Sequence, residues 1–383
     1  MTATRRKTIL FMIDSLNGGG AERVLIHILR DLDRKRFAVS LFAVIKEGVY
    51  LKDVPKDVPI QAIFKSTADF RHPLSIALYR LYRRTTLELF KIFPSLLARM
   101  SGIRQSYDVG VSFCEGHNTP LLALKSAKFG KTLAWIHIDL RHHQAMIRKQ
   151  ALRRYARHFD KIHFVSEGAK AGFLELFPEF SRQTNLDVVL NPIDRQSILE
   201  AGKEPIAARQ KPMVLAIGRL MHQKRFDKLL NVHKRLIDKG IEHEVWILGE
   251  GGDRKALEAQ IDRLGIGKTC FLPGFVNPYP YLCAADVFVM TSDYEGLPVV
   301  ICEAMVMAKP IVATAVTGPS ELLENGKYGV LTENAEAAIE TALQTMLEQP
   351  KLRESYSRKL RENRENFIFP TNVKDIEERL MAL

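Results

Sequence analysis

Short apolar runs that alternate with helical segments constrain the fold of this chain more than any other feature. In the first half, we expect strands at residues 8–13, 38–45, 60–64, 108–113, 131–136, 161–166 and 187–190. In the second half, we expect them at residues 212–217, 244–248, 270–272, 286–291, 310–314 and 329–331. Strands that alternate with helices predict parallel sheets with helices on both faces. Ligands of such sheets bind at the carboxyl ends of the strands.

The polar segment 195–211 separates the two sets of strands. A chain of 383 residues suggests two or three domains. We therefore predict an α/β fold of two doubly wound, Rossmann-like domains, at residues 1–194 and 212–367, joined by this segment as a linker. Residues 368–383 are expected to form a terminal helix that could pack back on the first domain. The sheet ends of the two domains would face each other across a cleft that holds the active site.

Charge is distributed unequally between the two halves of the chain. Residues 1–190 carry 31 Lys and Arg against 17 Asp and Glu, whereas residues 191–383 carry 25 against 27. A basic half suggests an acidic partner, either nucleic acid or an anionic membrane surface. The sequence contains no nucleic-acid-binding motif. We therefore expect no nucleic-acid partner and an anionic membrane surface bound by the first domain.

Residues 71–100 interrupt the alternation of strands and helices. They carry six Lys and Arg against one acidic residue, Glu88, with leucines and aromatic residues between them. A basic amphipathic helix pair of this composition is typical of a segment that lies on a membrane surface. The alternative is an ordinary surface helix packed on its own sheet. The charge of the whole first half favours the membrane interpretation.

The cysteines and the apolar runs indicate the compartment. None of the four cysteines forms a C-x-x-C pair, and three lie in apolar runs, which predicts buried, reduced thiols in a reducing compartment. The apolar run at 8–13 is too short for a signal peptide. No run approaches the roughly eighteen apolar residues that a membrane span needs. We expect a cytoplasmic protein that is peripheral on the inner face of the cytoplasmic membrane.

The strongest functional signal is the stretch Glu295-Gly296-Leu297-Pro298-Val299-Val300-Ile301-Cys302-Glu303. It follows the expected strand 286–291 and enters an apolar helix. Gly296 permits a tight passage into the helix, and Pro298 suits its first turn. The N-terminus of a helix favours anions, and a carboxylate accepts hydrogen bonds from hydroxyl groups. The stretch therefore predicts that phosphate and sugar are recognised together.

Other polar residues follow expected strands at the ligand-binding edge. Arg219 and Lys224 come after strand 212–217, and two cations at this edge suit a diphosphate. Glu115, His117 and His137 follow two strands of the first half, so we treat them as candidate site residues. Such a histidine can equally be an ordinary loop residue. A glycine turn after strand 8–13 resembles a phosphate cradle, although it is not the dinucleotide fingerprint.

Taken in order, several motifs resemble the retaining glycosyltransferases of family four, which have the GT-B fold. The motifs are Gly18-Gly19-Gly20-Ala21-Glu22-Arg23, Asn191-Pro192-Ile193-Asp194, Gly218-Arg219-Leu220 with Lys224, Gly249-Glu250-Gly251, the stretch from Ser292 through Glu295 to Glu303, and Gly318 with Glu321. The E-x7-E pattern with its Glu-Gly-Leu-Pro start is the specific part. The resemblance covers nearly the whole chain, but residues 71–100 match no motif.

The resemblance implies a nucleotide-diphosphate sugar, with a UDP-sugar favoured, in the second domain and a glycan acceptor in the first. Glu295, His137, Arg219 and Lys224 would be catalytic. The residues implied to bind the donor are Gly19, Gly20, Arg219, Lys224, Gly249, Phe275, Val276, Glu295, Gly296, Leu297, Pro298, Val299 and Glu303. Within this set, Glu295 would bind the donor sugar and Glu303 the ribose. Glu115 and His117 are the candidates for acceptor binding.

The implied reaction is glycosyl transfer with retention of configuration, for a lipid-linked or cell-surface glycan such as lipopolysaccharide or capsule. Fixed cations would stabilise the leaving diphosphate, so no metal or other cofactor is expected. The Asp31-Leu32-Asp33 sequence has the letters of a metal motif but falls at a helix end. Two departures from the family pattern are Thr317-Gly318-Pro319, which replaces a glycine pair, and Asn191-Pro192, which replaces Asn-Gly.

Two other functions fit parts of the sequence. A sugar-nucleotide epimerase or a phosphorylase would keep the fold and change the reaction, although no pyridoxal-type lysine motif supports a phosphorylase. A basic nucleic-acid-binding protein is suggested only by the isoelectric point of about 9.5.

Overall fold

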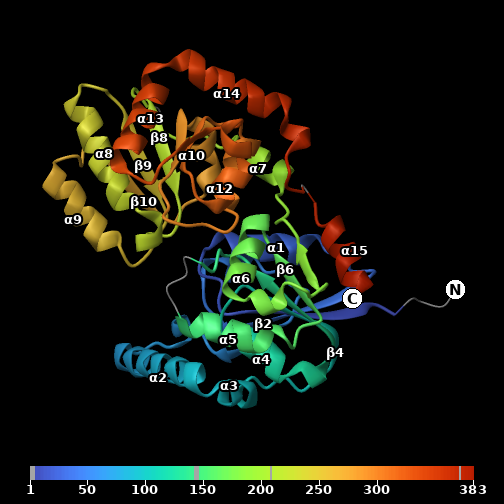
Figure 1. Ribbon diagram of the computed structural model, residues 1–383. Helices are drawn as coiled ribbons and strands as arrows, with labels where there is room; N and C mark the ends of the chain where they lie inside the picture. The colour runs from blue at the N-terminus through green and yellow to red at the C-terminus, as the bar shows by residue number, and fades with distance from the viewer. Residues whose placement is uncertain (1–4, 142–145, 208, 371) are drawn as a thin grey trace. The chain divides into compact units, whose positions relative to one another are not determined.

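A computed structural model describes residues 5–141, 146–207, 209–370 and 372–383 of the protein (Figure 1). The chain divides into two compact units. Unit 1 comprises Met1–Pro192 and Asn372–Leu383, and unit 2 comprises Ile193–Thr371. Each unit contains one sheet whose strand pairs are all parallel. The predicted α/β class with two Rossmann-like domains is therefore confirmed.

Unit 1 is built on a seven-stranded sheet with the order β3-β2-β1-β4-β5-β6-β7. Its strands are β1 (Lys7–Ile13), β2 (Phe37–Ile45), β3 (Ile60–Phe64), β4 (Tyr107–Phe113), β5 (Phe129–Ile136), β6 (Lys161–Phe164) and β7 (Leu186–Val188). The strand order reverses between β1 and β4, which pair directly. The loops after these two strands therefore meet, and such a reversal is where open α/β sheets bind ligands.

Helices cover both faces of the unit 1 sheet (Figure 1). They are α1 (Gly20–Asp31), α2 (Pro73–Ile92), α3 (Pro94–Met100), α4 (Asn118–Leu124), α5 (Met146–Ala156), α6 (Glu167–Leu176) and the C-terminal α15 (Lys374–Ala382). Helix α15 is fixed within unit 1, because Glu377 accepts a hydrogen bond from the Asp33 N–H at 2.7 Å and pairs with Arg36 at 3.4 Å. Unit 1 is therefore formed by two segments of the chain, residues 1–192 and 372–383.

Unit 2 is built on a six-stranded sheet with the order β10-β9-β8-β11-β12-β13. Its strands are β8 (Met213–Ile217), β9 (Glu244–Leu248), β10 (Cys270–Gly274), β11 (Val287–Met290), β12 (Ile311–Thr314) and β13 (Val330–Thr332). Here the order reverses between β8 and β11. The loop that holds Arg219 and Lys224 therefore lies beside the loop that leads to Glu295, although about seventy residues separate them in the chain.

The helices of unit 2 are α7 (Arg195–Ala201), α8 (Phe226–Asp238), α9 (Arg254–Leu264), α10 (Pro278–Ala284), α11 (Val299–Val306), α12 (Thr317–Leu322), α13 (Glu336–Glu348) and α14 (Pro350–Glu362). The segment 195–211, expected as a linker, begins with α7 and belongs to unit 2. Helix α7 buries Ile198, and a Cβ added to Gly202 would lie 2.3 Å from the Met307 side chain. The helix was not predicted because the segment is mostly polar, and α7 has a single buried residue, Ile198.

Burial of the cysteines differs from the expectation. Cys270 and Cys302 are buried, Cys114 is partly buried and Cys283 is exposed. Burial raises the pKa of the Cys270 thiol to about 12, so this thiol stays protonated and unreactive. In the described part of the chain, no helix is both long enough and apolar enough to cross a bilayer.

Candidate active site

The loops after β8 and β11 bring a lysine and a glutamate into contact. Lys224 Nζ lies 2.5 Å from Glu295 Oε1, and both side chains are largely buried, with 17% and 9% of their surface exposed. The lysine stem passes over Gly218, where an added Cβ would approach Lys224 Cε to 3.3 Å. Arg219, the other predicted cation, is exposed on the same loop. The structure thus brings the predicted cation Lys224 into contact with the first carboxylate of the E-x7-E stretch.

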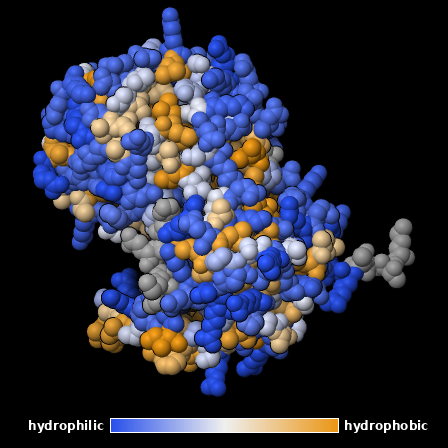
Figure 2. Space-filling view, in the orientation of Figure 1, coloured by the Kyte–Doolittle hydropathy of each residue, from blue (hydrophilic) through white to orange (hydrophobic). Residues whose placement is uncertain are grey.

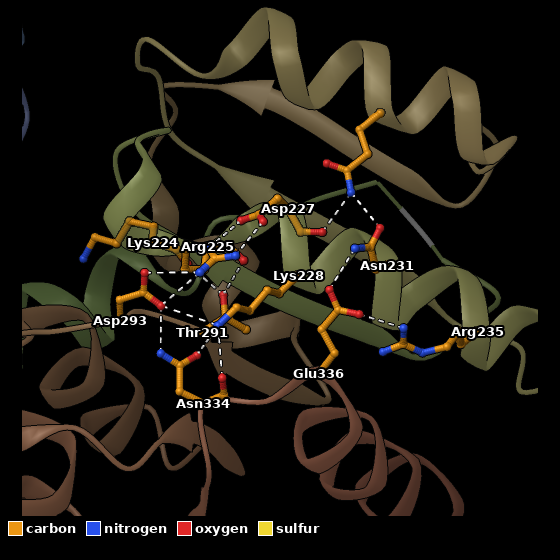
Figure 3. A network of polar contacts seen from close by, with 11 residues as sticks. Lys224, Arg225, Asp227, Lys228, Asn231, Arg235, Thr291, Asp293, Asn334 and Glu336 are labelled. Carbon is orange, nitrogen blue, oxygen red and sulfur yellow. Dashed lines mark hydrogen bonds and ion pairs between the residues drawn. The ribbon is translucent and has the colours of Figure 1, made fainter.

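Hydrogen bonds hold the two loops in register. The Gln223 side chain donates to the Tyr294 carbonyl at 2.7 Å, and the Asp293 N–H donates to the Gln223 carbonyl at 2.9 Å. Arg225 has a left-handed backbone, with φ at 51°, and its guanidinium contacts Asp227 at 3.0 Å and Asp293 at 3.3 Å. Figure 3 shows this network, with Lys224 pointing away from it. The network fixes the loop backbone and leaves Lys224 for the site.

Glu303, the second carboxylate of the stretch, lies inside α11 and is 1% exposed. Its Oε1 accepts a hydrogen bond from the Tyr279 hydroxyl of α10 at 3.1 Å. A buried carboxylate that already accepts one hydroxyl is chemically suited to accept another from a ligand. Pro298 is the N-cap of α11 rather than its first helical residue, so the helix starts one position later than predicted. Because proline has no N–H, only Leu297 and Val299 of the 297–299 segment can donate to an anion.

Two glycines allow neighbouring loops to touch at this edge of the sheet. Gly249 has a φ of 143°, and an added Cβ would lie 2.0 Å from the Gly218 carbonyl oxygen. Gly318 also has no room for a side chain, because an added Cβ would lie 2.3 Å from the Gly296 carbonyl oxygen. A side chain at either position would push the cation loop or the Glu295 loop out of place. The absence of a side chain at Gly249 and Gly318 therefore lets the loops of the site pack closely against each other.

The remaining predicted donor residues of unit 2 differ in exposure. The side chains of Leu297 and Val299 are buried, at 6% and 7% exposure, so they pack rather than contact a ligand. Phe275 is 42% exposed and follows β10, while Val276 beside it is partly buried. Phe275 is thus accessible to a ligand, in keeping with its predicted place beside a base.

In unit 1, the loop after β4 is organised around Asp14, which follows β1. The Asp14 carboxylate accepts hydrogen bonds from the backbone N–H groups of His117 and Asn118, from His117 Nδ1 and from Asn118 Nδ2, each at 3.0 Å. Burial opposes ionisation of Asp14, but the bonds from His117 and Asn118 and the His117 charge outweigh it and lower the pKa of this carboxyl. Gly116 has no room for a side chain, because a Cβ would meet Asp14 Oδ2 at 2.4 Å.

His117, predicted to bind the acceptor, has both ring nitrogens engaged within unit 1. Nδ1 contacts Asp14, and Nε2 lies 3.3 Å from the Leu87 carbonyl oxygen of α2. Glu115, the other predicted acceptor residue, accepts hydrogen bonds from the N–H groups of His137 and of Ile138 at the end of β5. Both side chains thus have structural partners, and their contact with an acceptor stays a prediction.

His137 differs from Glu115 and His117 because one of its ring nitrogens is available to hydrogen-bond a ligand. It is 9% exposed, and its Nε2 is buried with no hydrogen-bond partner in the described part of the chain. Desolvation lowers the pKa of His137 to about 3, so the ring is neutral at physiological pH. The ring packs against Phe113 at a centroid distance of 4.6 Å, which fixes its position. A fixed, neutral imidazole nitrogen can hydrogen-bond a hydroxyl group.

The glycine loop before α1 is closed by a side chain from the helix itself. The Gly19 N–H donates to Glu22 Oε2 at 2.7 Å, and Gly20 is the exposed first residue of α1. Glu22 therefore occupies the Gly19 N–H that the sequence suggested for a phosphate. The role of Gly19 and Gly20 in donor binding stays a prediction.

The sequence interpretation missed Tyr279, Asp14 and Arg225. Tyr279 lies in a short Pro-rich helix, and only the fold brings its hydroxyl to Glu303. Asp14 follows a strand, as the predicted site residues do, so its position at the strand end was the signal that could have identified it. Arg225 directly follows the predicted Lys224, and its left-handed backbone could not be inferred from the sequence.

Comparison with known proteins gives a consistent assignment. Residues 200–363, most of unit 2, match the family model described as glycosyl transferases group 1. The chain is 26% identical over 358 residues, covering 91% of the chain and 92% of the relative, to the N-acetylgalactosamine-N,N'-diacetylbacillosaminyl-diphospho-undecaprenol 4-alpha-N-acetylgalactosaminyltransferase of Campylobacter jejuni. It is 24% identical to the amylovoran biosynthesis glycosyltransferase AmsD of Erwinia amylovora, with the same coverage of 91% and 92%.

A solved structure extends the comparison to the fold of both units. Anabaena Alr3699/HepE, crystallised in complex with UDP and glucose, superposes with a TM-score of 0.74 at 21% identity over 98% of each chain. At this identity the likeness concerns the fold, which is the GT-B fold that the sequence resemblance implied. The family model and both relatives to which the chain is similar are glycosyltransferases.

Proposed function

We propose that the chain is a group 1 glycosyltransferase, which moves a sugar from a nucleotide-diphosphate sugar to a lipid-linked or cell-surface glycan with retention of configuration. The observation that carries the proposal is the Lys224–Glu295 pair, which joins the loops after the neighbouring strands β8 and β11, with Glu303 buried in the helix that follows β11. A diphosphate, a sugar hydroxyl and a ribose hydroxyl are the three groups that such a donor presents.

The Lys224–Glu295 pair is the part of the site that the donor would rearrange. Lys224 would exchange the carboxylate for the diphosphate, which carries more charge, and Arg219 would join it from the same loop. Glu295 would then be released to accept a hydrogen bond from the donor sugar. Glu303, held by Tyr279, would accept from the ribose. The first N–H groups of α11 add a positive end near the phosphates.

In the proposed reaction, the bond between the sugar anomeric carbon and the diphosphate oxygen breaks. A new bond to the acceptor oxygen forms on the same face of the sugar, and the leaving phosphate takes the acceptor proton. Lys224 and Arg219 would stabilise the charge that develops on the leaving group, which is the role a metal plays in other transferases. We therefore propose catalysis without a metal, and expect activity to persist in EDTA.

The acceptor class is proposed from the relatives. One acts on an undecaprenol-linked sugar by its name, and the other takes part in the biosynthesis of amylovoran. A UDP-sugar is our first choice of donor, since HepE was crystallised with UDP. His137 of unit 1, with its unpaired Nε2, would hydrogen-bond the transferred sugar.

An apolar face on α2 supports a proposed membrane contact of unit 1. Leu74, Leu78, Leu81, Leu89 and Ile92 recur at helical spacing and are each 44% to 69% exposed. The exposed cations Arg80, Arg84 and Lys91 lie on the same helix. In Figure 2, hydrophobic side chains gather over α2 at the lower left. A helix with exposed leucines beside cations suits the surface of an anionic bilayer, where a lipid-linked acceptor would be found.

Arg83 does not belong to this face. Its guanidinium lies 2.5 Å from Glu47 Oε2, and the side chain is only 18% exposed. A membrane test should therefore change Arg80 and Arg84 and keep Arg83, because loss of Arg83 would remove the ion pair that anchors α2 to Glu47. In flotation with phosphatidylglycerol vesicles, we expect R80A/R84A and L78Q/L81Q to release the protein. R153A/R154A, with equal charge loss on α5, is the control, and unchanged flotation of both α2 variants would refute the membrane face.

The transfer reaction is tested by a screen of nucleotide sugars that reads the release of free nucleoside diphosphate. We expect Glu295→Ala to abolish release with the best donor. Release by Glu295→Ala at the wild-type rate would refute the site. Isomerisation of the donor without an acceptor would instead identify an epimerase, and consumption of phosphate with a glycan would identify a phosphorylase. Tight, salt-sensitive binding to duplex DNA without any turnover would refute the enzyme assignment altogether.

A further inference from the structure

The sheet of unit 2 is covered unevenly at its β10 edge. On one face, Val245 and Ile247 of β9 are fully buried beneath α8 and α9. On the opposite face, Trp246 of β9 and Phe271 of β10 are only partly buried. Side chains alternate between the faces of a strand, and the sheets of α/β proteins are normally covered on both. A tryptophan in the second-to-edge strand would therefore be expected to be buried, and it is not.

A pocket of about 470 Å³ lies over this face of unit 2. Its lining includes Trp246, Tyr281 of α10, and residues 204–207 with Arg209, which follow α7. The volume is within the range of roughly 300–1,000 Å³ that small-molecule sites occupy. The pocket shares Val276 with the predicted base site but otherwise uses residues that neither the mechanism nor the E-x7-E stretch needs.

The walls of the pocket combine aromatic rings with hydrogen-bonding groups. Trp246 packs between Phe271, at a centroid distance of 4.6 Å, and Tyr281, at 5.6 Å. The Trp246 Nε1–H donates to Glu244 Oε2 at 3.0 Å, which fixes the indole in its plane. At the rim, the Asn277 side chain donates to Glu204 Oε2 at 3.2 Å.

One cation in the pocket has unused hydrogen-bonding capacity. Arg209 donates through Nη2 to the Ala284 carbonyl at 2.5 Å. Its Nη1 is buried with no hydrogen-bond partner among the described residues, and the nearest carboxylate oxygen, of Asp286, is 3.9 Å away. A buried donor of this kind is costly to leave unpaired, so a ligand oxygen would stabilise it.

These walls fit a neutral sugar better than a nucleotide. Aromatic rings stack against the apolar C–H face of a pyranose, while carboxylate, amide and guanidinium groups take its hydroxyls. The two carboxylates, Glu204 and Glu244, would repel a diphosphate. We propose that this pocket is a second, non-catalytic carbohydrate site, which holds one or two neutral sugar units of a glycan on unit 2.

The proposal is tested with purified full-length protein and a panel of neutral saccharides: maltose, cellobiose, lactose and N,N'-diacetylchitobiose. Saturation-transfer NMR detects weak binding of each, in the millimolar range expected for a small sugar site. We expect at least one disaccharide to bind in the presence of saturating UDP. Trp246→Leu and Tyr281→Leu should each weaken this binding about tenfold or more, whereas the control Tyr356→Leu, on α14, should leave it unchanged.

Two outcomes would overturn the proposal. Absence of binding by the whole panel would exclude a neutral-sugar site, and displacement of the sugar by UDP would assign the signal to the donor site instead. Release of nucleoside diphosphate is measured in parallel, because the pocket does not take part in the proposed transfer. A Trp246→Leu variant that keeps diphosphate release but loses disaccharide binding separates the two functions. Failure of the transfer reaction alone leaves the result for the pocket intact.

Discussion

The carboxyl ends of the two sheets are built from different chemistry. In unit 2, a lysine and two carboxylates approach the edge, and Lys224 and Glu295 are paired there at 2.5 Å. In unit 1, the Asp14 carboxylate accepts hydrogen bonds from the backbone and side chains of residues 117–118. Among the predicted site residues of unit 1 that the structure describes, His137 has a buried side-chain nitrogen without a hydrogen-bond partner, and its imidazole is neutral. Unit 2 is thus suited to a charged ligand, and unit 1 to an uncharged one.

The difference has a physical cause. A buried charge is stable only when it is paired, and a diphosphate can replace the partner of Lys224 because it is itself charged. A sugar hydroxyl cannot replace a charge, but it can satisfy the single buried nitrogen of His137. The two units therefore hold these polar groups in different ways, unit 2 as an ion pair and unit 1, at His137, as an unfilled hydrogen bond.

The largest expected effect comes from removing the cation of unit 2. Lys224→Met should lower kcat by about 100- to 1,000-fold, which is the usual loss when one group that stabilises the leaving charge is removed. Diphosphate release with the best donor is the measurement. Lys327→Met, at an exposed ion pair of the same unit, is the matched control.

Loss of Lys224 also leaves Glu295 buried without its partner, so a loss of activity could reflect unfolding. K224M/E295Q removes both charges and should recover the thermal stability without recovering the activity. If this double variant were as active as the wild-type protein, the exchangeable ion pair would have no part in catalysis, and the contrast between the two sheet ends would be broken.

The next effect concerns the uncharged site of unit 1. His137→Phe keeps a ring against Phe113 and removes the nitrogen, so we expect kcat/KM to fall about tenfold, the value of one neutral hydrogen bond of up to about 1.5 kcal/mol. Because the pKa of His137 is about 3, the wild-type pH–rate profile between pH 5 and 8 should show no ionisation that disappears in the variant. An ionisation near pH 6.5 that vanishes in His137→Phe would show that this imidazole titrates and is not a neutral donor.

The sequence predicted the architecture well because most strands are short and mainly apolar, and their alternation with helices leaves few other arrangements. The sequence also named Lys224 and Glu295, whose side chains the structure brings into contact, while their roles and that of Glu303 stay predictions. The partners that cross the fold could not be predicted in this way. Tyr279 reaches Glu303 only because α10 and α11 are neighbours in space. His117 was chosen for its position after a strand, and only the structure shows that Asp14 and Leu87 occupy its ring.

A smaller effect sharpens the comparison within unit 2. Tyr279→Phe removes the hydroxyl that holds Glu303 Oε1 and should raise KM for the donor about three- to tenfold with little change in kcat. For a donor that lacks the ribose 2′-hydroxyl, KM should differ little between the wild-type protein and Tyr279→Phe, because this donor has no 2′-hydroxyl for Glu303 to bind. Equal sensitivity for both donors would place Tyr279 and Glu303 away from the ribose.

The smallest effect tests whether unit 1 keeps its buried imidazoles neutral. His163 on β6 is 4% exposed, and its pKa is about 4, chiefly because of desolvation. A histidine with a lowered folded-state pKa adds its full stability above the unfolded value of about 6.5 and loses it as the pH falls, since the unfolded chain then binds the proton that the folded state refuses. Between pH 7.5 and pH 6, this one group should account for about 0.8 kcal/mol of lost stability.

His163→Phe should remove this share of the acid sensitivity, because the ring still fits against Trp135, at a centroid distance of 5.5 Å, and no longer titrates in the unfolded chain. Hydrogen exchange of the β5 and β6 amides at the two pH values reports on unit 1 alone. His72→Phe, which changes an exposed histidine of the same unit, should leave the pH dependence as it is in the wild-type protein. If His163→Phe kept the full acid sensitivity, His163 would be protonated in the folded state, and its buried imidazole would not be neutral.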